Sequence, residues 1–501
     1  MSVYCNLWRT AHGIRAAPSG GIFMSKPSPL RSRAAGFFDD PAFFRALFVL
    51  ALPIVVQNLL VSSLNMIDTL MIGRVGEAEV AAVGAANQFF FLLQMAMNGI
   101  ASGCSVFIAQ FWGGGSREGI HKVLGIGLIS MAAVGLAFTG VALLIPLPII
   151  RMFAHEEAVQ GFGRDYLTIV CLSYLPTAVS FLLANAQRSI GNALTPMLIS
   201  LGAVLTNTFF NYLLIFGKAG FPALGVKGAA IATLIARVAE CVLLLAFSLR
   251  KRCPLRGKWR DYWRFNAAFF RKTYATILPV VLNEGCWGLG SVLYTVAYGL
   301  IGTYALAATN ITSTVQNLFM VLCLGIASAA LVMIGNRIGS GEPETARRYA
   351  GKFTVIAAAL GLVLGAALFV CAPLIPTFFE ISPEAMRAAA TILRIFGVIF
   401  IARMVNTLTI IGVFRGGGDA GYALKLEAGT MWILGVPLAF LGACVLRLPV
   451  EGVVLLVSVE EIVKCLFVLG RLKSGKWLHP AQRTGEEAVS APEESARPEE
   501  D

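Results

Sequence analysis

The stretch from Leu50 to Gly73 reads LALPIVVQNLLVSSLNMIDTLMIG and contains a single charged side chain, Asp68. As an α-helix it would be about 36 Å long, and roughly 20 apolar residues are enough to cross the hydrocarbon core of a bilayer. Its apolar residues lack the strict alternation that the strands of a transmembrane barrel require. The stretch therefore predicts a membrane-spanning α-helix.

The composition of the whole chain extends this prediction. Of its 501 residues, 57% are hydrophobic and only 14% are charged. That is about half the charged share of a soluble domain, and it excludes a disordered chain, a coiled coil and an ordinary soluble enzyme. We expect an all-α polytopic membrane protein with twelve transmembrane helices. These are expected to begin near Phe48, Val80, Val123, Tyr166, Pro196, Gly228, Thr273, Leu306, Phe353, Ala388, Leu426 and Gly452.

Basic residues indicate how the helices are oriented. The predicted loop between helices six and seven, residues 250–264, contains seven Lys and Arg, whereas the turn near Gly302 contains no charge. Lys and Arg accumulate in cytoplasmic loops, so we expect both termini to be cytoplasmic and the protein to lie in the plasma (inner) membrane. The net charge of +12 is explained in the same way, which leaves the lipid bilayer rather than nucleic acid as the expected partner.

The chain repeats itself. A shift of 226 places residues 52–118 on residues 278–344 without a gap and superposes the GIAS motif at Gly99 on the GIAS motif at Gly325. This alignment gives 18 identities, against roughly five expected by chance. A shift of 227 then places Arg188 of RSIGN on Arg415 of RGGGD.

Each repeat contains six predicted helices, an even number, so both halves enter the membrane from the same side. Such parallel repeats are typical of transporters with a site between two lobes near the bilayer midplane. We therefore predict two six-helix lobes around a central cleft. The expected domains are a cytoplasmic extension at 1–40 (with Met24 an alternative start), an N-lobe at 41–250, a linker at 251–270, a C-lobe at 271–477 and a disordered acidic tail at 478–501.

Charged side chains inside a membrane are costly and call for a function or a partner. On the first helix, Asn58, Asn65 and Asp68 fall within an arc of about 80° and can face one cavity. Asn207 and Asn211 are spaced i, i+4 on the fifth helix. A carboxylate beside amide oxygens suits a proton or Na⁺, although Asp68 could instead form a structural hydrogen bond between helices.

The second half contains an acid of its own. Glu284 lies on a stripe of small and polar residues of the seventh helix, but the repeat aligns it with Asn58, and it aligns Asp68 with Tyr294. The two acids are therefore not equivalent. Other membrane charges suggest partners within the protein, namely Arg237 with Glu240, Lys464 with Glu460 or Glu461, and Arg403 with Glu284 or Glu427.

Polar and aromatic residues on the predicted helices are candidates to line the cavity. These are Gln57, Asn58, Asn65, Gln88, Tyr294, Tyr298 and Asn310. The sequence contains no GxxxxGK[ST] phosphate loop, so we expect neither enzymatic activity nor a cofactor, and we expect an ion gradient to drive transport. The ten cysteines show no CxxC or Cys/His spacing and are expected to be small packing residues.

Several motifs together resemble the multidrug and toxic compound extrusion (MATE) family, and its NorM-like branch in particular. They are the stretch from Leu50 to Gly76, NxxxNYLLIFG at 207–217, GVKGAAIAT at 225–233, and the pair RSIGN and RGGGD. The resemblance covers about Phe48 to Trp477. It implies two six-helix lobes with a V-shaped central cleft, and export of organic cations in exchange for H⁺ or Na⁺.

The resemblance also implies roles for single residues. The family's helix-one aspartate falls on Asp68, and its helix-five partners fall on Asn207 and Asn211, with Thr233 on helix six nearby. The helix-seven glutamate of the NorM-like branch falls on Glu284, but its helix-ten aspartate meets the stretch 404–406, which contains no acid. A possible Na⁺ site is thus expected at Asp68 or Glu284, with no other metal.

We therefore expect a monomeric antiporter for small organic cations. A lipid-linked or polysaccharide flippase of the same superfamily is one alternative, and a channel or non-transporting membrane scaffold is another. A flippase would need clustered basic residues in its cavity to bind pyrophosphate.

Overall fold

The computed structural model describes residues 40–154, 156–379 and 381–480, and the regular elements of this part are all helical. The expected extension at 1–40 and the acidic tail lie almost entirely outside the described residues. The helices of the first half are α3 (Pro41–Gly73), α4 (Glu77–Gly113), α5 (Arg117–Leu144), α6 (Pro146–Arg151), α7 (Glu157–Val170), η2 (Cys171–Ser173), α8 (Tyr174–Ser189), α9 (Leu194–Phe216) and α10 (Val226–Ser248).

The second half follows the short helix η3 (Trp259–Tyr262) of the linker. Several of its helices pass into π-helical turns without leaving the bundle. They are α11 (Ala267–Gly299), α12 (Thr303–Gly339), α13 (Pro343–Cys371), η4 (Ile375–Phe378), α14 (Pro383–Thr407), η5 (Leu408–Phe414), α15 (Ala420–Thr430), η6 (Met431–Gly435), α16 (Val436–Phe440), η7 (Leu441–Val445) and α17 (Val450–Ser474).

The twelve predicted spans are present. Within the described residues, eleven helical segments are long and apolar enough to cross a membrane. The twelfth, α17, is interrupted by Glu460, Glu461 and Lys464 and packs mainly against α14. The helices begin up to ten residues before the predicted starts, as at Pro343, because each polar first turn is already helical.

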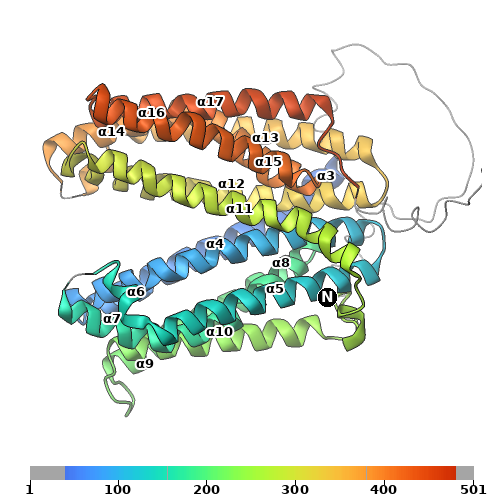
Figure 1. Cartoon of the computed structure of the whole chain (residues 1–501), viewed down its shortest axis with the longest axis horizontal. Coiled ribbons are helices and arrows are strands. Elements are labelled where there is room, and N and C mark those ends of the chain that lie inside the picture. The colour runs from blue at the N-terminus through green and yellow to red at the C-terminus, as the bar shows by residue number, and fades with distance from the viewer. Residues whose placement is uncertain (1–39, 155, 380, 481–501) are drawn as a thin grey trace, which may run out of the picture.

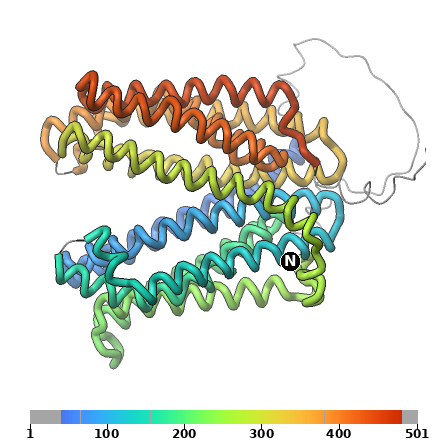
Figure 2. The backbone as a smooth tube through the Cα atoms, viewed as in Figure 1, coloured from blue at the N-terminus to red at the C-terminus, as the bar shows by residue number. Residues whose placement is uncertain are grey.

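Two bundles make up the molecule, α3–α10 and α11–α17 (Figures 1 and 2). Their helices lie side by side at the end that contains the α10–α11 connection, and they diverge toward the opposite end. We call the first of these the linker end. Helices α3 and α4 of the first bundle pack against α12, and α4 also packs against α11.

Glycines allow the bundles to cross closely, and they do so symmetrically. A Cβ on Gly99 would lie 2.5 Å from the Cα of Val281, and a Cβ on Gly325 would lie 2.3 Å from Cγ2 of Val55. These residues are partners under the shift of 226, so each contact is the image of the other. The internal repeat is therefore also a symmetry of the interface.

The same symmetry holds at the linker end. A Cβ on Gly113 would lie 2.0 Å from the carbonyl oxygen of Asn336, and one on Gly339 would lie 1.8 Å from that of Gln110. Only a residue without a side chain permits this approach of two helix backbones.

The segment after α17 belongs to the folded part. Trp477 is buried, and His479 N donates to Gly417 O at 2.8 Å. Gln110 of the first bundle donates to the carbonyl oxygen of His479 at 3.4 Å. The acidic tail was expected to begin at Leu478; Leu478 and His479 continue the segment that Trp477 holds against the second bundle.

The cysteines fit their expected role. The nine cysteines within the described part of the chain are all free, and five of them lie buried in the helix packing.

Asp40 anchors the start of α3. Its carboxylate accepts from Phe43 N at 3.0 Å and pairs with buried Lys352 at 3.1 Å. Partial burial raises the pKa of Asp40, but the bonds from Lys352 and Phe43 outweigh it, so the pKa lies below its usual value. A lowered carboxyl pKa stabilises the fold above the ordinary aspartate pKa, and this contribution is lost as the pH falls through the lowered value.

Asparagine can still cap the helix, but it removes the charge that pairs with buried Lys352, so we expect Asp40→Asn to destabilise the purified protein by about 1–3 kcal/mol at neutral pH. Thermal unfolding of both proteins from neutral pH to pH 3 checks this. The difference between them should shrink at acid pH, where wild-type Asp40 is also protonated. A constant difference across the range would contradict the assignment to the ionised carboxylate.

Candidate functional site

Four predicted residues meet where α3, α9 and α10 pack together. Asn211 Nδ2 donates to Asp68 Oδ1 at 2.5 Å and to Asn207 Oδ1 at 2.8 Å. Asn207 Nδ2 donates in turn to Thr233 Oγ1 at 3.3 Å. The i, i+4 spacing of the two asparagines places both on the face of α9 that α3 and α10 cover. We call these four residues the Asp68 cluster.

The Asp68 cluster has unused capacity for a cation. Asn207 and Asn211 are 1% and 0% exposed, and Asn211 Oδ1 has no hydrogen-bond partner in the described structure. No basic side chain of the described residues lies within ion-pair distance of Asp68. A buried acceptor without a donor costs free energy, so a carboxylate and an open amide oxygen favour a proton or a small cation here.

Glu284 lies in the other bundle and has a different environment. Its carboxylate pairs with Arg415 at 2.9 Å. Arg415 also donates to Asn283 Oδ1 at 2.7 Å and, across the bundles, to Ser102 Oγ at 3.3 Å. The structure therefore does not bring Asp68 and Glu284 into one site, and it gives Glu284 a cationic partner within the protein.

The first bundle contains a second polar chain beneath the Asp68 cluster. Arg188 donates to Gln57 Oε1 at 2.6 Å, Gln57 donates to Ser200 Oγ at 2.7 Å, and Ser200 donates to Glu240 Oε1 at 2.7 Å. Glu240 also accepts from Arg237 at 3.0 Å, which confirms the predicted pair. Each polar group in this chain thus donates to or accepts from the next.

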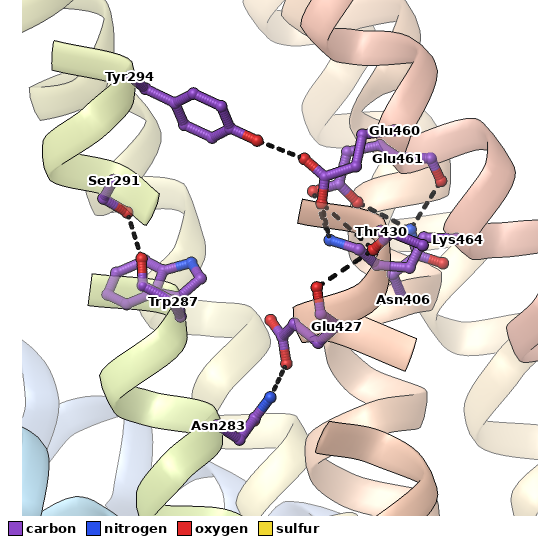
Figure 3. Close-up of polar contacts among 10 residues, drawn as sticks. All are labelled: Asn283, Trp287, Ser291, Tyr294, Asn406, Glu427, Thr430, Glu460, Glu461 and Lys464. Carbon is purple, nitrogen blue, oxygen red and sulfur yellow. Dashed lines mark hydrogen bonds and ion pairs between the residues drawn. The ribbon is translucent and has the colours of Figure 1, made fainter. Parts of the chain in front are cut away.

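The second bundle repeats the start of that chain. Arg415 donates to Asn283, and Asn283 Nδ2 donates to Glu427 Oε2 at 2.9 Å. The shift of 226 places Gln57 on Asn283. The shift of 227 places Arg188 on Arg415 and Ser200 on Glu427. Figure 3 shows Asn283 and Tyr294 of α11 pointing toward acids on α15 and α17.

The expected ion pairs have different outcomes. Lys464 pairs with Glu460 at 2.8 Å, as predicted. The expectation that Arg403 pairs with Glu284 or Glu427 was wrong, because Arg403 on α14 donates instead to Gln316 of the adjacent α12. Glu284 already pairs with Arg415, so it does not require Arg403 as a partner.

The predicted cavity-lining residues fall into two groups. Gln57 is buried within its own bundle, and Tyr294 and Tyr298 point into the second bundle, where Tyr294 donates to Glu460 Oε2 at 2.7 Å. Asn58 is half-buried, whereas Gln88 and Asn310 are exposed. Asn65 lies on α3, but its side chain is outside the described structure.

The sequence reasoning did not assign functional roles to Arg188, Ser200 and Arg415. The two arginines served only as markers of the repeat, and the serine is one of many in apolar runs. The available signal was the repeat itself, since Arg188 and Arg415 align while their amide partners, Gln57 and Asn283, also align.

Thr233 contributes one weak hydrogen bond to the Asp68 cluster and also bonds to the hydroxyl of buried Tyr166. We expect Thr233→Val, which keeps the shape, to cost about 1 kcal/mol in stability and to leave gradient-driven efflux above half the wild-type rate. Thermal unfolding and transport by the same preparation measure both effects. Complete loss of transport would show that the hydroxyl itself binds the ion.

Comparison with known families agrees with the internal repeat. The sequence model of the family described as MatE matches residues 53–213 and 279–441, which together make up more than half of the chain. The two matched segments begin 226 residues apart, the same offset as the repeat.

Individual proteins support the match along most of the chain. The uncharacterized transporter YisQ of Bacillus subtilis is 24% identical, covering 86% of this chain and 95% of its own. The probable multidrug resistance protein NorM of Thermotoga maritima is 25% identical, covering 89% and 96%. The rabbit (Oryctolagus cuniculus) multidrug and toxin extrusion protein 1 is 23% identical, covering 88% and 76%.

Solved structures show the same fold. The Vibrio cholerae MATE transporter VcmN in its bent form superposes with a TM-score of 0.79 at 20% identity, covering 87% of this chain and 99% of that one. A MOP superfamily transporter from Pyrococcus furiosus superposes with a TM-score of 0.78 at 20% identity, covering 87% and 97%. Since the MatE sequence model matches more than half of its residues, the chain belongs to the MatE family.

Proposed function

We propose that this protein is a secondary antiporter that exports small organic, mainly cationic, compounds in exchange for H⁺ or Na⁺. The observation that carries the proposal is the Asp68 cluster, a carboxylate without a basic partner in the described structure, beside a buried amide oxygen without a donor. Relatives named as multidrug resistance and extrusion proteins support the class of cargo.

The two-bundle architecture supplies the means of alternating access. The bundles meet at the linker end through backbone contacts at glycines and diverge at the opposite end. Rocking of one bundle against the other would expose the intervening space first to one side of the membrane and then to the other. Binding of H⁺ or Na⁺ at Asp68 changes the charge of the first bundle and so favours release of a cationic compound.

The orientation follows from charge. The linker holds basic side chains outside the apolar spans, and the start of α3 and the end of α17 lie at the same end of the molecule. By the positive-inside rule this end is cytoplasmic, and we place the protein in the plasma membrane with both termini inside. The diverging end then faces outward.

The flippase alternative is less well supported. It requires basic side chains free to bind pyrophosphate. Arg188, Arg415 and Lys464 each bond to acceptors within their own bundle. Arg415 and Lys464 are thus paired with carboxylates, and Arg188 is held by the amide of Gln57, so of their buried nitrogens only the Nε–H groups of the two arginines remain without a partner in the described structure.

Dye efflux from proteoliposomes tests the function. Protein is reconstituted with a fluorescent organic cation, and a pH gradient, a Na⁺ gradient or neither is imposed. Efflux driven by one of the gradients and abolished by its collapse is the expected result. Equal efflux under all conditions would indicate a channel, and no efflux of any tested cation under any gradient would contradict the proposal.

A further inference from the structure

The second bundle contains a buried group of charges that the proposed function does not use. Lys464 is 6% exposed, and its ammonium lies 2.8 Å from Glu460 Oε1 and 3.6 Å from Glu461 Oε1. One cation is thus shared by two carboxylates. Figure 3 shows this group, which we call the Glu427 cluster. Its members are Asn283, Tyr294, Asn406, Glu427, Thr430, Glu460, Glu461 and Lys464.

Glu427 adds a further carboxyl that has no cation of its own. Its side chain accepts from Asn283 Nδ2 at 2.9 Å, and no basic group of the described residues lies within ion-pair distance of it. Thr430 Oγ1 lies 3.3 Å from the backbone oxygen of Glu427 and 3.4 Å from Glu460 Oε1. The cluster therefore contains more carboxyl groups than cations, which is costly inside a membrane.

The first bundle shows what the position of Glu427 requires. Its repeat partner Ser200 accepts from Gln57 and donates to Glu240 at 2.7 Å in each case. A carboxylate at this position can only accept, whereas a protonated carboxyl can accept and donate as a serine does. Only protonated Glu427 carries a hydroxyl like that of Ser200, and only this form leaves Glu427 without a negative charge beside the acids of α17.

The adjacent helices differ in the sign of their charges. Aligned from Val226 and Val450, where α10 and α17 begin, Arg237 and Glu240 correspond to Glu461 and Lys464. In the first bundle Glu240 receives the hydrogen bond of Ser200. Lys464 takes the place of Glu240 in the second bundle. Ionised Glu427 would compete for this lysine with the acids of α17, and protonated Glu427 would not.

A second, independent observation concerns Asn406, whose side-chain oxygen receives no hydrogen bond from any described residue. Asn406 is 2% exposed, and its amide donates to Glu461 Oε2 at 2.8 Å, yet its own Oδ1 has no partner in the described structure. An unsatisfied buried acceptor beside carboxylates shows that the network has fewer donors than acceptors, which favours uptake of a proton by one of its carboxyls. Gly435 allows the Tyr294 hydroxyl and the Glu460 carboxylate to approach η6 closely, because a Cβ there would lie 1.9 Å from that hydroxyl and 2.5 Å from Glu460 Oε2.

We propose that the Glu427 cluster is a second coupling site, in which the carboxyl of Glu427 takes up a proton and thereby leaves Lys464 to Glu460 and Glu461. The proton comes from water on one side of the membrane and returns to water on the other, and loss of it draws Lys464 toward Glu427. Since α15 and α17 carry these groups, the exchange shifts one helix relative to the other. The inference builds on the proposed antiport.

A proton fits better than a metal ion. Among the described residues, no group of three or more His, Cys, Asp or Glu side chains is placed to hold a metal. The charged and titratable groups that face Glu427 also leave little room for one, since most are already paired. They are Glu284 from α11, Arg415 after η5 and Lys464 from α17, and behind Lys464 lie Glu460 with Tyr294 and Glu461 with Arg403.

Labelling of the intact purified protein tests the proposal without a transport assay. A hydrophobic carbodiimide adds to protonated carboxyls in apolar surroundings, and peptide mass spectrometry locates the adduct. We expect labelling at Glu427 and not at Glu460 or Glu461. Above the midpoint, labelling should fall about tenfold per pH unit, as the protonated fraction does. Labelling of the α17 acids instead of Glu427 would overturn the proposal.

Variants and Na⁺ provide the second measurement. Infrared spectroscopy over the same pH range should show one protonated carboxyl fewer in Glu427→Gln and in Glu427→Ser than in the wild type. The serine variant places at this position the residue that the first bundle has there, Ser200. The exposed control Glu384→Gln should show no such loss. An unchanged signal in either folded variant would overturn the assignment, as would loss of the wild-type signal on adding Na⁺ at constant pH. Since these readouts do not require efflux, failure of the proposed function would be recognised separately.

Discussion

Asp68→Asn is expected to reduce gradient-driven efflux to the level of liposomes without protein while leaving the protein folded. Asparagine has nearly the same shape as aspartate, and its amide oxygen can still accept the bond from Asn211 Nδ2 that the carboxylate accepts at 2.5 Å. What is lost is the charge that a proton or Na⁺ would neutralise. The variant therefore separates ion coupling from packing between α3 and α9.

Asp165→Asn is the matched control. This aspartate of α7 is exposed and pairs with Lys227 at 3.1 Å, a contact of the kind that contributes at most about 1 kcal/mol. The same chemical change at that position should leave efflux at the wild-type rate. Wild-type efflux in Asp68→Asn, with size-exclusion and thermal-unfolding profiles like those of the control, would remove Asp68 from the coupling mechanism.

The fold could be predicted from sequence because its signals are local or periodic. Uninterrupted apolar runs fix the spans, and the 226-residue offset fixes the relation between the halves. All twelve helices begin two to ten residues before the predicted starts, and the shift is largest at Pro343 of α13, where a polar first turn precedes the apolar run. Lipid imposes these features on each helix separately, so they do not depend on its neighbours.

The site was predictable only in part, since it depends on how the helices are rotated against one another. The spacing of Asn207 and Asn211 identified a polar face of α9, and the position of Asp68 identified one of α3. That these two faces meet was implied by the family resemblance. Arg403 shows the limit, because its partner Gln316 lies on a neighbouring helix 87 residues away and had no distinguishing pattern.

The repeat contains more information than its identities suggest. Aligned positions with different residues, such as Ser200 and Glu427, mark where the halves have diverged in chemistry while keeping the same contacts. Without coordinates such a pair cannot be told from neutral drift. With them, the difference becomes a change from a hydroxyl to an ionisable group at a fixed point in a polar chain.

The backbone contact at the linker end leads to the second large effect. Gly339→Ala places a methyl group where the structure leaves 1.8 Å to the carbonyl oxygen of Gln110. The carbonyl belongs to a helix backbone and the methyl carbon is bonded directly to one, so neither can turn aside as the end of a flexible side chain would. The bundles should then be unable to close at this end, and efflux should fall to background although each bundle folds, since the contact lies between them and not within either.

Gly351→Ala on α13 is the control, because no atom lies within 4 Å of its added Cβ. In a helix this change stabilises by up to about 1 kcal/mol, and it should leave transport intact. Spin labels at the exposed repeat partners Glu118 and Glu344 would report the separation of the bundles, which should increase in Gly339→Ala and stay unchanged in the control. If Gly339→Ala had the wild-type distance between the spin labels and the wild-type efflux rate, the contact between α4 and α12 would have to loosen enough to admit a methyl group. Closure of the linker end would then depend on other contacts.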